Sequence, residues 1–361
     1  MKKRTLILKN NKYNILISKD QNEFILALKK IITTNTLFII TDRNVKKLYL
    51  KYLADLLKEQ GFNIKTAIIS AGETGKNIKN LSALYDKALE KNLDRKSCVI
   101  SLGGGVVGDI VGFFAATYMR GIDFIQVPTT LISMTDSSIG GKTAINTNHG
   151  KNIAGTFYQP KFVWINPSFL ETLPMQQVKS GLAEVIKYSI IFDKKFYYYL
   201  FNMFEKGVIS SSSFDYIIYQ SCLYKVKVVK KDEKETTGLR SLLNFGHTFA
   251  HALETITKYK KFLHGEALAI GMLFAAKLSS ELKICSDETY QRVKNILIEA
   301  NFNLKTKINC TKFLSLMKKD KKAVNGNINF VLIKDIGKAT NYYVKDDIVL
   351  NVLRKFFGIM K

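Results

Sequence analysis

The chain has 361 residues, of which 47% are hydrophobic and 24% are charged, and it contains only four prolines. This is the composition of a globular protein of about two domains with a sizeable core, and it excludes an intrinsically disordered or Pro-rich chain. No run of about 18 uncharged apolar residues is present, and the apolar piece at residues 5–8 is too short for a signal peptide. We therefore expect a cytoplasmic protein without a membrane span.

The formal net charge of +25 at pH 7 would suit a nucleic-acid-binding protein, because cationic side chains neutralise phosphates. However, only seven of the 55 basic residues are arginine, which reads bases best, and the lysines are spread along the whole chain. We therefore expect no nucleic-acid partner and attribute the charge to compositional drift. The four cysteines form no CxxC pair, which predicts free, structural thiols.

Strand and helix patterns alternate through the first half of the chain. Residues 6–18 predict a short strand pair with its turn at residues 10–12. Continuous apolar runs predict buried strands, and apolar residues at helical spacing predict the helices between them. The strands expected are 36–42, 63–70, 97–102 and 123–127, and the helices are 45–60 and 77–92. This alternation predicts an α/β domain on a largely parallel sheet.

The pattern changes after Pro174, where helical periodicity dominates. Helices are expected at residues 176–205, 213–232, 241–258, 265–282 and 286–300, with one late strand at 327–336. The second half is therefore expected to be an all-α domain. With a boundary near residue 175, the two domains are predicted to be 1–175 and 176–361.

A glycine-rich loop follows the strand at 97–102. Gly103, Gly105 and Gly108 match G-x-G-x-x-G between a strand and a helix, where backbone N–H groups can hold a pyrophosphate. A tight turn rich in glycine is the alternative explanation. The acidic residue usual after the next strand is missing, and Asp42, at the end of an earlier strand, could bind the ribose hydroxyls instead.

Three of the four histidines lie within 18 residues. His247 and His251 are four residues apart on one helix face, and His264 begins the next helix, so their imidazoles could converge on a Zn²⁺ ion. A satisfied core histidine is the alternative for any single one. A further ligand is needed, and a carboxylate is expected.

Two other segments carry charges in informative places. Glu184 and Lys187 are three residues apart on an otherwise apolar helix, where they are either a buried ion pair or part of a site. Residues 134–152 combine Asp136, Lys142 and Lys151 with paired glycines, which suits an anion-binding loop between the domains. A solvated surface loop is the alternative.

The chain resembles the 3-dehydroquinate synthase family in six motifs that follow the family's order. They are GGGVVGDIVGFFAATYMRGI, QVPTTLISMTDSSIGGKTAIN, GKNIAGTFYQP, AEVIKYS, GLRSLLNFGHTFAHALE and HGEALAIGM. The resemblance runs from about residue 36 to residue 340. Ala250 and Ser189 stand where the family usually has glycine, and we expect packing adjustments there.

The resemblance implies an N-terminal Rossmann-like domain, a C-terminal helical domain and an active site between them. It implies conversion of 3-deoxy-D-arabino-heptulosonate 7-phosphate to 3-dehydroquinate and phosphate in the shikimate pathway. It also implies dependence on NAD and on one divalent metal ion, Zn²⁺ or Co²⁺. A homodimer is implied as well, because Arg120 matches an arginine that the neighbouring subunit offers.

Matching the motifs position by position assigns roles to individual residues. The positions of the metal ligands are Glu184, His247 and His264, so that His251 falls on the substrate side instead. The positions of NAD contacts are Asp42, Gly72, Glu73, Lys76, Gly104, Gly105, Val106, Val107, Gly108, Asp109, Thr129, Thr130, Lys142, Lys151, Phe169, Leu170, Glu171 and Thr172. The positions of catalytic and substrate contacts are Arg120, Asp136, Lys142, Asn152, Lys187, Lys225, Arg240, Asn244 and His251, and either Lys321 or Lys322 also reaches the phosphate.

Other functions remain as alternatives. Another sugar phosphate cyclase, such as a 2-deoxy-scyllo-inosose synthase, would need no carboxylate clamp, whereas Arg240 and Asn244 favour a carboxylate substrate. A metal-dependent polyol dehydrogenase would share the glycine loop but release NADH, and the SSIGGKTAIN segment argues against it.

Overall fold

The computed structural model describes residues 2–7, 12–207, 210–320 and 327–358, which form two compact units. The first unit comprises Met1–Pro174 and Phe214–Lys234, and the second comprises Met175–Ser213 and Glu235–Lys361. The division after Pro174 lies where the sequence puts it. However, residues 214–234, which the sequence places in the second domain, pack in the first unit. The reason is that Ile217, Ile218 and Cys222 are buried there, with the Cys222 Sγ 3.4 Å from the carbonyl oxygen of Met134.

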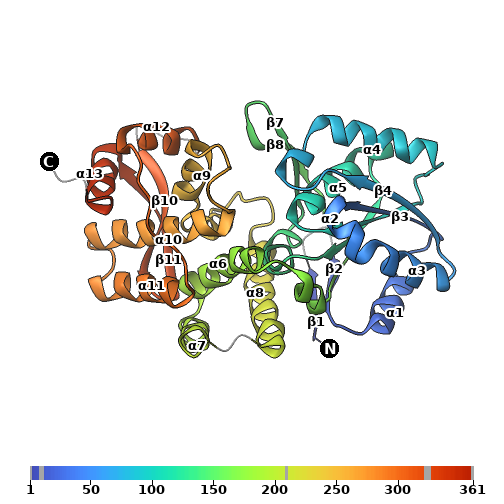
Figure 1. The fold of residues 1–361 in the computed structure, drawn as a ribbon, viewed down its shortest axis with the longest axis horizontal. Helices are drawn as coiled ribbons and strands as arrows, with labels where there is room; N and C mark the ends of the chain where they lie inside the picture. The colour runs from blue at the N-terminus through green and yellow to red at the C-terminus, as the bar shows by residue number, and fades with distance from the viewer. Residues whose placement is uncertain (1, 8–11, 208–209, 321–326, 359–361) are drawn as a thin grey trace. The chain divides into compact units, whose positions relative to one another are not determined.

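The first unit is built on one largely parallel sheet (Figure 1). Its described strands are, in spatial order, β1 (Lys2–Ile7), β2 (Lys12–Ile17), β9 (Phe162–Ile165), β6 (Asp123–Pro128), β5 (Cys98–Gly103), β3 (Thr36–Asp42) and β4 (Asn63–Ile69). Only β1 and β2 pair antiparallel. The strand pair expected at residues 6–18 is thus present, but its first strand begins earlier, at Lys2, and part of the expected turn lies outside the described residues. The remaining strands are parallel, so their carboxyl ends share one edge of the sheet.

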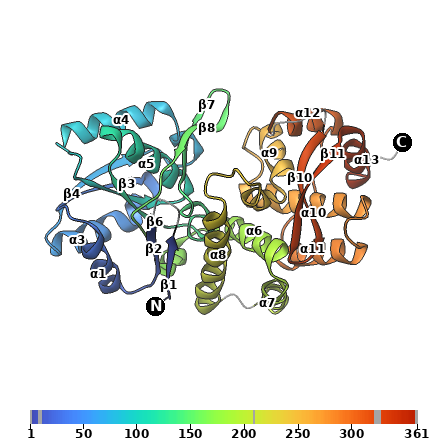
Figure 2. The same ribbon diagram turned by 180° about the vertical axis from the view of Figure 1, so that it is seen from behind.

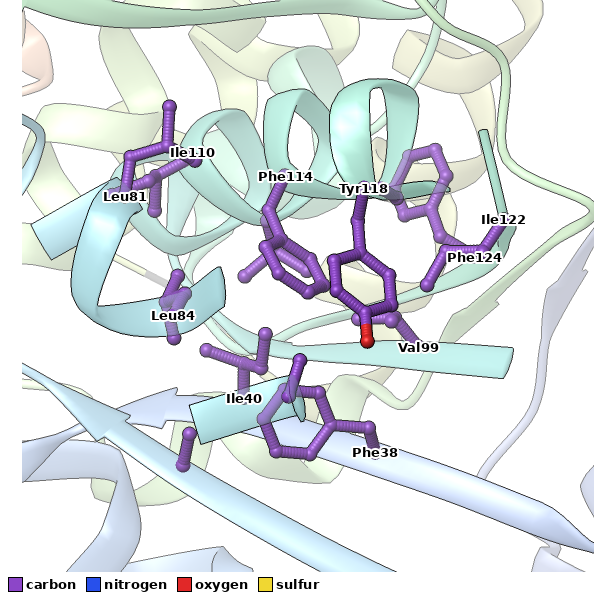
Figure 3. Close-up of a cluster of buried hydrophobic side chains, with 14 of the residues drawn as sticks. Phe38, Ile40, Leu81, Leu84, Val99, Ile110, Phe114, Tyr118, Ile122 and Phe124 are labelled. Carbon is purple, nitrogen blue, oxygen red and sulfur yellow. The ribbon is translucent and has the colours of Figure 1, made fainter. Parts of the chain in front are cut away.

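Helices cover both faces of this sheet. The helices α4 (Ile78–Glu90) and α5 (Gly105–Thr117) lie on one face, and α1 (Gln21–Ile31) and α3 (Lys51–Glu59) lie on the other (Figures 1 and 2). Phe38 and Ile40 of β3 pack against Leu84 of α4 and Phe114 of α5 in a fully buried layer (Figure 3). Strands that are buried on both faces are continuously apolar, which is why the sequence showed them as uninterrupted apolar runs.

The segment expected as a loop at 134–152 is instead mostly a hairpin. It begins with one π-helical turn, η4 (Ser133–Ser137), and continues into β7 (Lys142–Thr147), which pairs antiparallel with β8 (Gly150–Phe157). The expectation was wrong because the glycines and charges flank a short run of three buried residues, Thr143, Ala144 and Ile145, which is too short to stand out as a strand. Gly112 of α5 provides the space for Thr143, since a Cβ there would lie 2.4 Å from the Thr143 Cγ2.

The second unit is helical with one β-hairpin. Its helices are α6 (Met175–Phe192), α7 (Lys194–Glu205), the start of α8 (Ser211–Lys231), α9 (His247–Ile256), α10 (His264–Glu281), α11 (Asp287–Glu299), α12 (Cys310–Asp320) and α13 (Asp346–Phe356). The late strand expected at 327–336 is β10 (Asn327–Asp335), and its partner β11 (Lys338–Lys345) was not foreseen. Within the described ranges, every helix is too short or too polar to span a lipid bilayer.

The helix expected at residues 241–258 is broken at Gly246. A short 3₁₀ segment, η6 (Arg240–Asn244), precedes the break, and α9 begins after it. Gly246 has a φ of +80°, a left-handed conformation that side chains other than glycine rarely adopt. The same glycine lies against Gly271 of α10, where an added Cβ would be 2.1 Å from the Gly246 carbonyl oxygen. This close approach fixes α9 against α10.

We expect Gly271→Ala to destabilise the protein by about 1–3 kcal/mol, because the methyl group forces two backbones apart. Urea unfolding would measure the difference. Lys277→Ala on the same helix is the matched control, since it removes a partly exposed pair with Glu281 and a cation–π contact with Tyr290 without displacing any backbone, and it should cost about 1 kcal/mol. Equal losses in the two variants would contradict the close-packing argument.

Candidate active site

Three potential metal ligands of the second unit converge on one point. The Oε1 atom of Glu184, on α6, lies 3.4 Å from the Nε2 of His247 on α9 and 3.4 Å from the Nε2 of His264 on α10. One ligand atom from each residue lies within 4.8 Å of the other two. The three helices thus bring together two imidazoles and a carboxylate, the donors that zinc prefers.

The second nitrogen of each imidazole has its own partner. His247 Nδ1 lies 3.4 Å from the carbonyl oxygen of Phe245, and His264 Nδ1 lies 3.5 Å from Oε1 of the buried Glu254. Such outer partners fix the ring orientation and the tautomer of a histidine that binds metal. Sequence reasoning missed Glu254, although its position seven residues after His247 places it on nearly the same face of α9.

The charge of Lys187 reaches the same carboxylate. Its Nζ forms an ion pair with Glu184 Oε2, and both side chains are almost completely buried. The sequence left a buried ion pair and a functional site as alternatives for these two residues. The structure shows that the ion pair is part of the cluster.

The buried charges lower the pKa of Glu184 and His247 and raise the pKa of His264. Burial alone would raise the pKa of Glu184, but the Lys187 ammonium and the two imidazoles hold it well below its ordinary value. Burial and the nearby Lys187 lower the pKa of His247 to about 3. Burial opposes protonation of His264 too, but Glu184 and Glu254 outweigh it and raise the pKa to about 9. His247 is thus a neutral donor, and His264 lies between two carboxylates.

His251 lies beside this cluster without belonging to it. Its ring centroid is 5.4 Å from that of His247, but it is not among the converging ligand atoms. This geometry does not favour the spacing-based expectation that both helix histidines bind the ion, and the assignment of His251 to the substrate side stays a prediction.

We expect Zn²⁺ to raise the melting temperature of the protein, because a ligand that binds only the folded state stabilises it, by about 2.7 kcal/mol at roughly 100 times its Kd. His264→Ala should abolish this shift, and Glu254→Ala should weaken zinc binding about 10- to 100-fold. Differential scanning fluorimetry against zinc concentration would measure both.

His251→Ala is the matched control for this series, since it removes an imidazole one turn away from His247. It should keep the zinc-dependent shift. A zinc shift that survives in His264→Ala and disappears in His251→Ala would contradict the ligand assignment.

Two expected substrate contacts, Arg240 and Asn244, lie on η6, and Asn244 brings in a third side chain, Glu235. Arg240 is 2% exposed, although it is a long cation, and Asn244 donates from Nδ2 to Glu235 Oε1 at 3.3 Å. Glu235 has a φ of +59°. The sequence did not single out Glu235, whose only signal is its place in the acidic segment before Arg240.

In the first unit, the NAD candidates gather at the carboxyl edge of the sheet. Five neighbouring strands end beside them: β9 before Phe169–Thr172, β6 before Thr129, β5 before Gly104, β3 at Asp42 and β4 before Glu73. Ligands of parallel α/β sheets bind outside the carboxyl ends of the strands. Tyr49, which sequence reasoning missed, fixes one side of this edge by donating to the Phe169 carbonyl at 3.2 Å.

The glycine loop is shaped for close approach of a ligand. Gly104 caps α5 without any side-chain hydrogen bond, and the first N–H groups of a helix have no intrahelical acceptor. A Cβ on Gly105 would lie 2.9 Å from Ser137 Oγ. Thr129 Oγ1 is buried and has no hydrogen-bond partner within the described residues. Val107 and Gly108 face the interior, where Gly108 packs on Gln126.

Asp42 and Thr172 have partners already. Asp42 Oδ1 caps the short helix α2 (Arg43–Val45) by accepting from the N–H groups of Asn44 and Val45. Thr172 Oγ1 lies 2.5 Å from the Tyr49 hydroxyl. Gly72, directly before Glu73, has a φ of +78°. The Thr130 hydroxyl is hydrogen-bonded to that of Ser133. The other NAD candidates at this edge of the sheet are Val106, Leu170 and Glu171.

A buried lysine connects the glycine loop with the hairpin. Lys76 is 2% exposed, and its Nζ contacts both Asp109 Oδ2 on α5 and Asn152 Oδ1 on β8. Burial raises the pKa of Asp109 above its ordinary value, although the Lys76 ammonium opposes this. The structure thereby joins two expected NAD contacts, Lys76 and Asp109, to an expected substrate contact, Asn152.

The remaining candidates of the first unit lie on other elements. Lys225, on α8, donates to Asp136 Oδ1 at 2.7 Å, and Lys142 begins β7 with its side chain exposed. Lys151 Nζ lies 3.8 Å from Glu73 Oε1. Arg120 is exposed and has a φ of +69°, next to Met119 with a φ of +48°. Lys321 and Lys322 lie outside the described residues.

Comparison with known proteins gives a consistent result. Residues 66–180 match the family model described as 3-dehydroquinate synthase N-terminal, and residues 181–323 match that described as 3-dehydroquinate synthase C-terminal. The chain is 65% identical over 358 residues to the 3-dehydroquinate synthase of Endomicrobium trichonymphae, which covers 99% of each protein.

Two solved structures share the whole fold. One is a 2-deoxy-scyllo-inosose synthase complexed with carbaglucose-6-phosphate, NAD⁺ and Co²⁺, with a TM-score of 0.88 and 23% identity over 98% of this chain and 99% of that one. The other is a 2-epi-5-epi-valiolone synthase from Streptomyces hygroscopicus with NAD⁺ and Zn²⁺ bound, with a TM-score of 0.87 and 25% identity over the same shares. The expected fold class, an α/β domain followed by a helical domain, is confirmed.

Proposed function

The chain belongs to the 3-dehydroquinate synthase family, and from this premise we propose that it converts 3-deoxy-D-arabino-heptulosonate 7-phosphate to 3-dehydroquinate and phosphate, a step of the shikimate pathway. The observation that carries the proposal is the 65% identity to a 3-dehydroquinate synthase over 99% of the chain. The other sugar phosphate cyclases share the fold at only 23% to 25% identity, so they are not favoured.

We propose NAD and one divalent metal ion, Zn²⁺ or Co²⁺, as cofactors. Supporting the metal is the convergence of Glu184, His247 and His264, whose imidazoles have outer partners suited to zinc ligands. Supporting NAD are the N-terminus of α5, which begins at a glycine with no side chain to occupy it, and the buried Thr129 hydroxyl, which has no hydrogen-bond partner within the described residues. The two cyclases of the same fold were solved with NAD⁺ and with Co²⁺ or Zn²⁺.

The chain's own residues bind and orient a substrate that carries two anionic groups. When bound, NAD supplies a reversible hydride acceptor and the metal supplies a Lewis acid for the substrate hydroxyls. The resemblance to the family assigns the carboxylate to Arg240 and to Lys225, and the planar guanidinium of Arg240 can form two parallel hydrogen bonds with such a group. Asp136 holds the Lys225 ammonium in place at 2.7 Å.

The phosphate of the substrate is bound by a second group of side chains. The resemblance to the family assigns this phosphate to Lys142 and Asn152 of the hairpin and to Asn244 and His251 of the helical unit, whose donors would neutralise its charge as the carbon–oxygen bond breaks. The leaving phosphate itself accepts the proton of the neighbouring carbon. The Lys187 ammonium keeps Glu184 ionised and partly balances the negative charge that Glu184 brings to the proposed metal site.

We also propose a homodimer and a cytoplasmic location, which the resemblance to the family implies. Arg120 is exposed and presented on a left-handed turn, which supports its role in the active site of a second copy in a homodimer. The enzyme acts in the cytoplasm without a nucleic-acid or membrane partner.

The proposal predicts one molecule of phosphate per molecule of heptulosonate phosphate, with no net NADH. The redox step is internal to each turnover, so catalytic NAD⁺ suffices. Phosphate release and absorbance of the NADH band, followed together in the zinc-loaded enzyme, would measure this. Net NADH without phosphate would contradict the proposal and favour a polyol dehydrogenase.

Arg240→Lys should lower kcat/KM for the heptulosonate phosphate about 10- to 100-fold, since a hydrogen bond to a charged group contributes about 1.5–3 kcal/mol. NAD⁺ affinity should stay unchanged, because Arg240 acts on the carboxylate. Steady-state kinetics with each ligand varied would separate the two effects. The control is Arg292→Lys, whose guanidinium pairs with Glu288 on the surface of α11; an equal loss in both variants would refute the carboxylate clamp.

A further inference from the structure

The tip of the β7–β8 hairpin is attached to the segment that follows β4. The attachment begins with the main chain of Asn146, whose N–H donates to the carbonyl oxygen of Lys76 at 2.8 Å. Asn77 and Asn146 also form an isolated parallel bridge. Two segments about 70 residues apart in sequence, both carrying proposed binding residues, are therefore joined at one residue.

The side chain of Asn146 uses both ends of its amide. Its Oδ1 accepts from the backbone N–H of Asn152 at 3.0 Å, and its Nδ2 donates to Glu73 Oε2 at 2.7 Å. A weaker contact from Nδ2 reaches the Glu73 carbonyl oxygen at 3.4 Å. An amide side chain can accept from one partner through its oxygen and donate to another through its nitrogen at the same time.

The bond to Asn152 has a conformational consequence. Asn152 has a φ of +57°, a left-handed conformation that costs energy unless its surroundings hold it. The backbone N–H of Asn152 donates to Asn146 Oδ1, and the Oδ1 of Asn152 accepts from Lys76 Nζ. The side chain of Asn152, itself exposed, is thereby fixed in direction from two sides.

The bond to Glu73 acts on a neighbouring cation. Glu73 Oε2 is bonded to Asn146, while its other oxygen, Oε1, lies 3.8 Å from Lys151 Nζ. Asn146 thus sets the rotamer of the carboxylate that faces Lys151. The two residues that Asn146 influences, Asn152 directly and Lys151 through Glu73, are consecutive in the sequence.

We propose that Asn146 is a positioning residue, which orients Asn152 toward the substrate phosphate and Glu73 and Lys151 toward the dinucleotide. This inference rests on the proposed function for the identity of the two ligands. The contacts themselves do not depend on it. No role in the chemical step is assigned to Asn146, since it acts only through its neighbours.

Two substitutions separate the two ends of the amide. Asn146→Ala removes both hydrogen bonds. Asn146→Asp keeps the acceptor for the Asn152 N–H but loses the donor and places a negative charge beside Glu73. The matched control is Asn148→Ala, which removes an exposed amide from the same hairpin.

In Asn146→Ala, the Asn152 amide should exchange its hydrogen faster than in the wild type, and the KM values for heptulosonate phosphate and NAD⁺ should both rise about 3- to 10-fold, the loss of one net hydrogen bond each. kcat should change less than either KM. Asn146→Asp should restore the Asn152 amide protection and the KM for heptulosonate phosphate, while the KM for NAD⁺ stays raised. Amide exchange over residues 147–153 and steady-state kinetics would measure these effects.

The proposal is wrong if Asn146→Ala leaves the Asn152 amide protected, or if its KM values rise no more than those of Asn148→Ala. It is also wrong if Asn146→Asp fails to restore the KM for heptulosonate phosphate, because a general loss of folding would not distinguish the two ends of the amide. Should the wild type release no phosphate at all, the proposed function fails instead. Amide exchange and the affinities for NAD⁺ and inorganic phosphate in the same variants would then still decide the role of Asn146.

Discussion

A carboxylate buried inside the helical unit is the constraint on which the rest of that unit depends. Removing Glu184 from water is costly unless positive charge and hydrogen-bond donors surround it. Lys187 supplies a charge from the same helix, and His247 and His264 supply nitrogens from α9 and α10. Three helices must therefore meet at one point, and the contact of Gly246 with Gly271 permits two of them to approach that closely.

In the α/β unit, the proposed ligand-binding groups come mainly from the backbone. Parallel strands leave their carboxyl ends along one edge, where helix N-termini and glycine turns can hold anions without many cations. The lysine that is buried there, Lys76, connects Asp109 of the glycine-loop helix with Asn152 of the hairpin. In each unit a buried lysine thus forms an ion pair with one of the proposed binding residues.

Much of this could be predicted from sequence, for reasons that are local. Uninterrupted apolar runs identified β3 and β5, and a glycine loop between a strand and a helix identified the start of α5. The motifs, rather than spacing, assigned Glu184 and excluded His251 as ligands, since helical spacing treats His247 and His251 alike. Contacts between distant segments could not be predicted. The contact of His264 with Glu254 depends on how α10 packs against α9. The hydrogen bonds of Asn146 with Glu73 and Asn152 depend on how the hairpin packs against the segment after β4. The packing of residues 214–234 in the first unit could not be predicted for the same reason.

The central claim is that Glu184, His247 and His264 hold one divalent metal ion. Anomalous X-ray scattering at the zinc edge, from crystals grown with Zn²⁺, tests this most directly. The account predicts a strong peak in each chain, about 2.0–2.2 Å from the two imidazole Nε2 atoms and a Glu184 oxygen. A strong peak elsewhere, with Glu184 bonded only to Lys187 and the histidines, would contradict it.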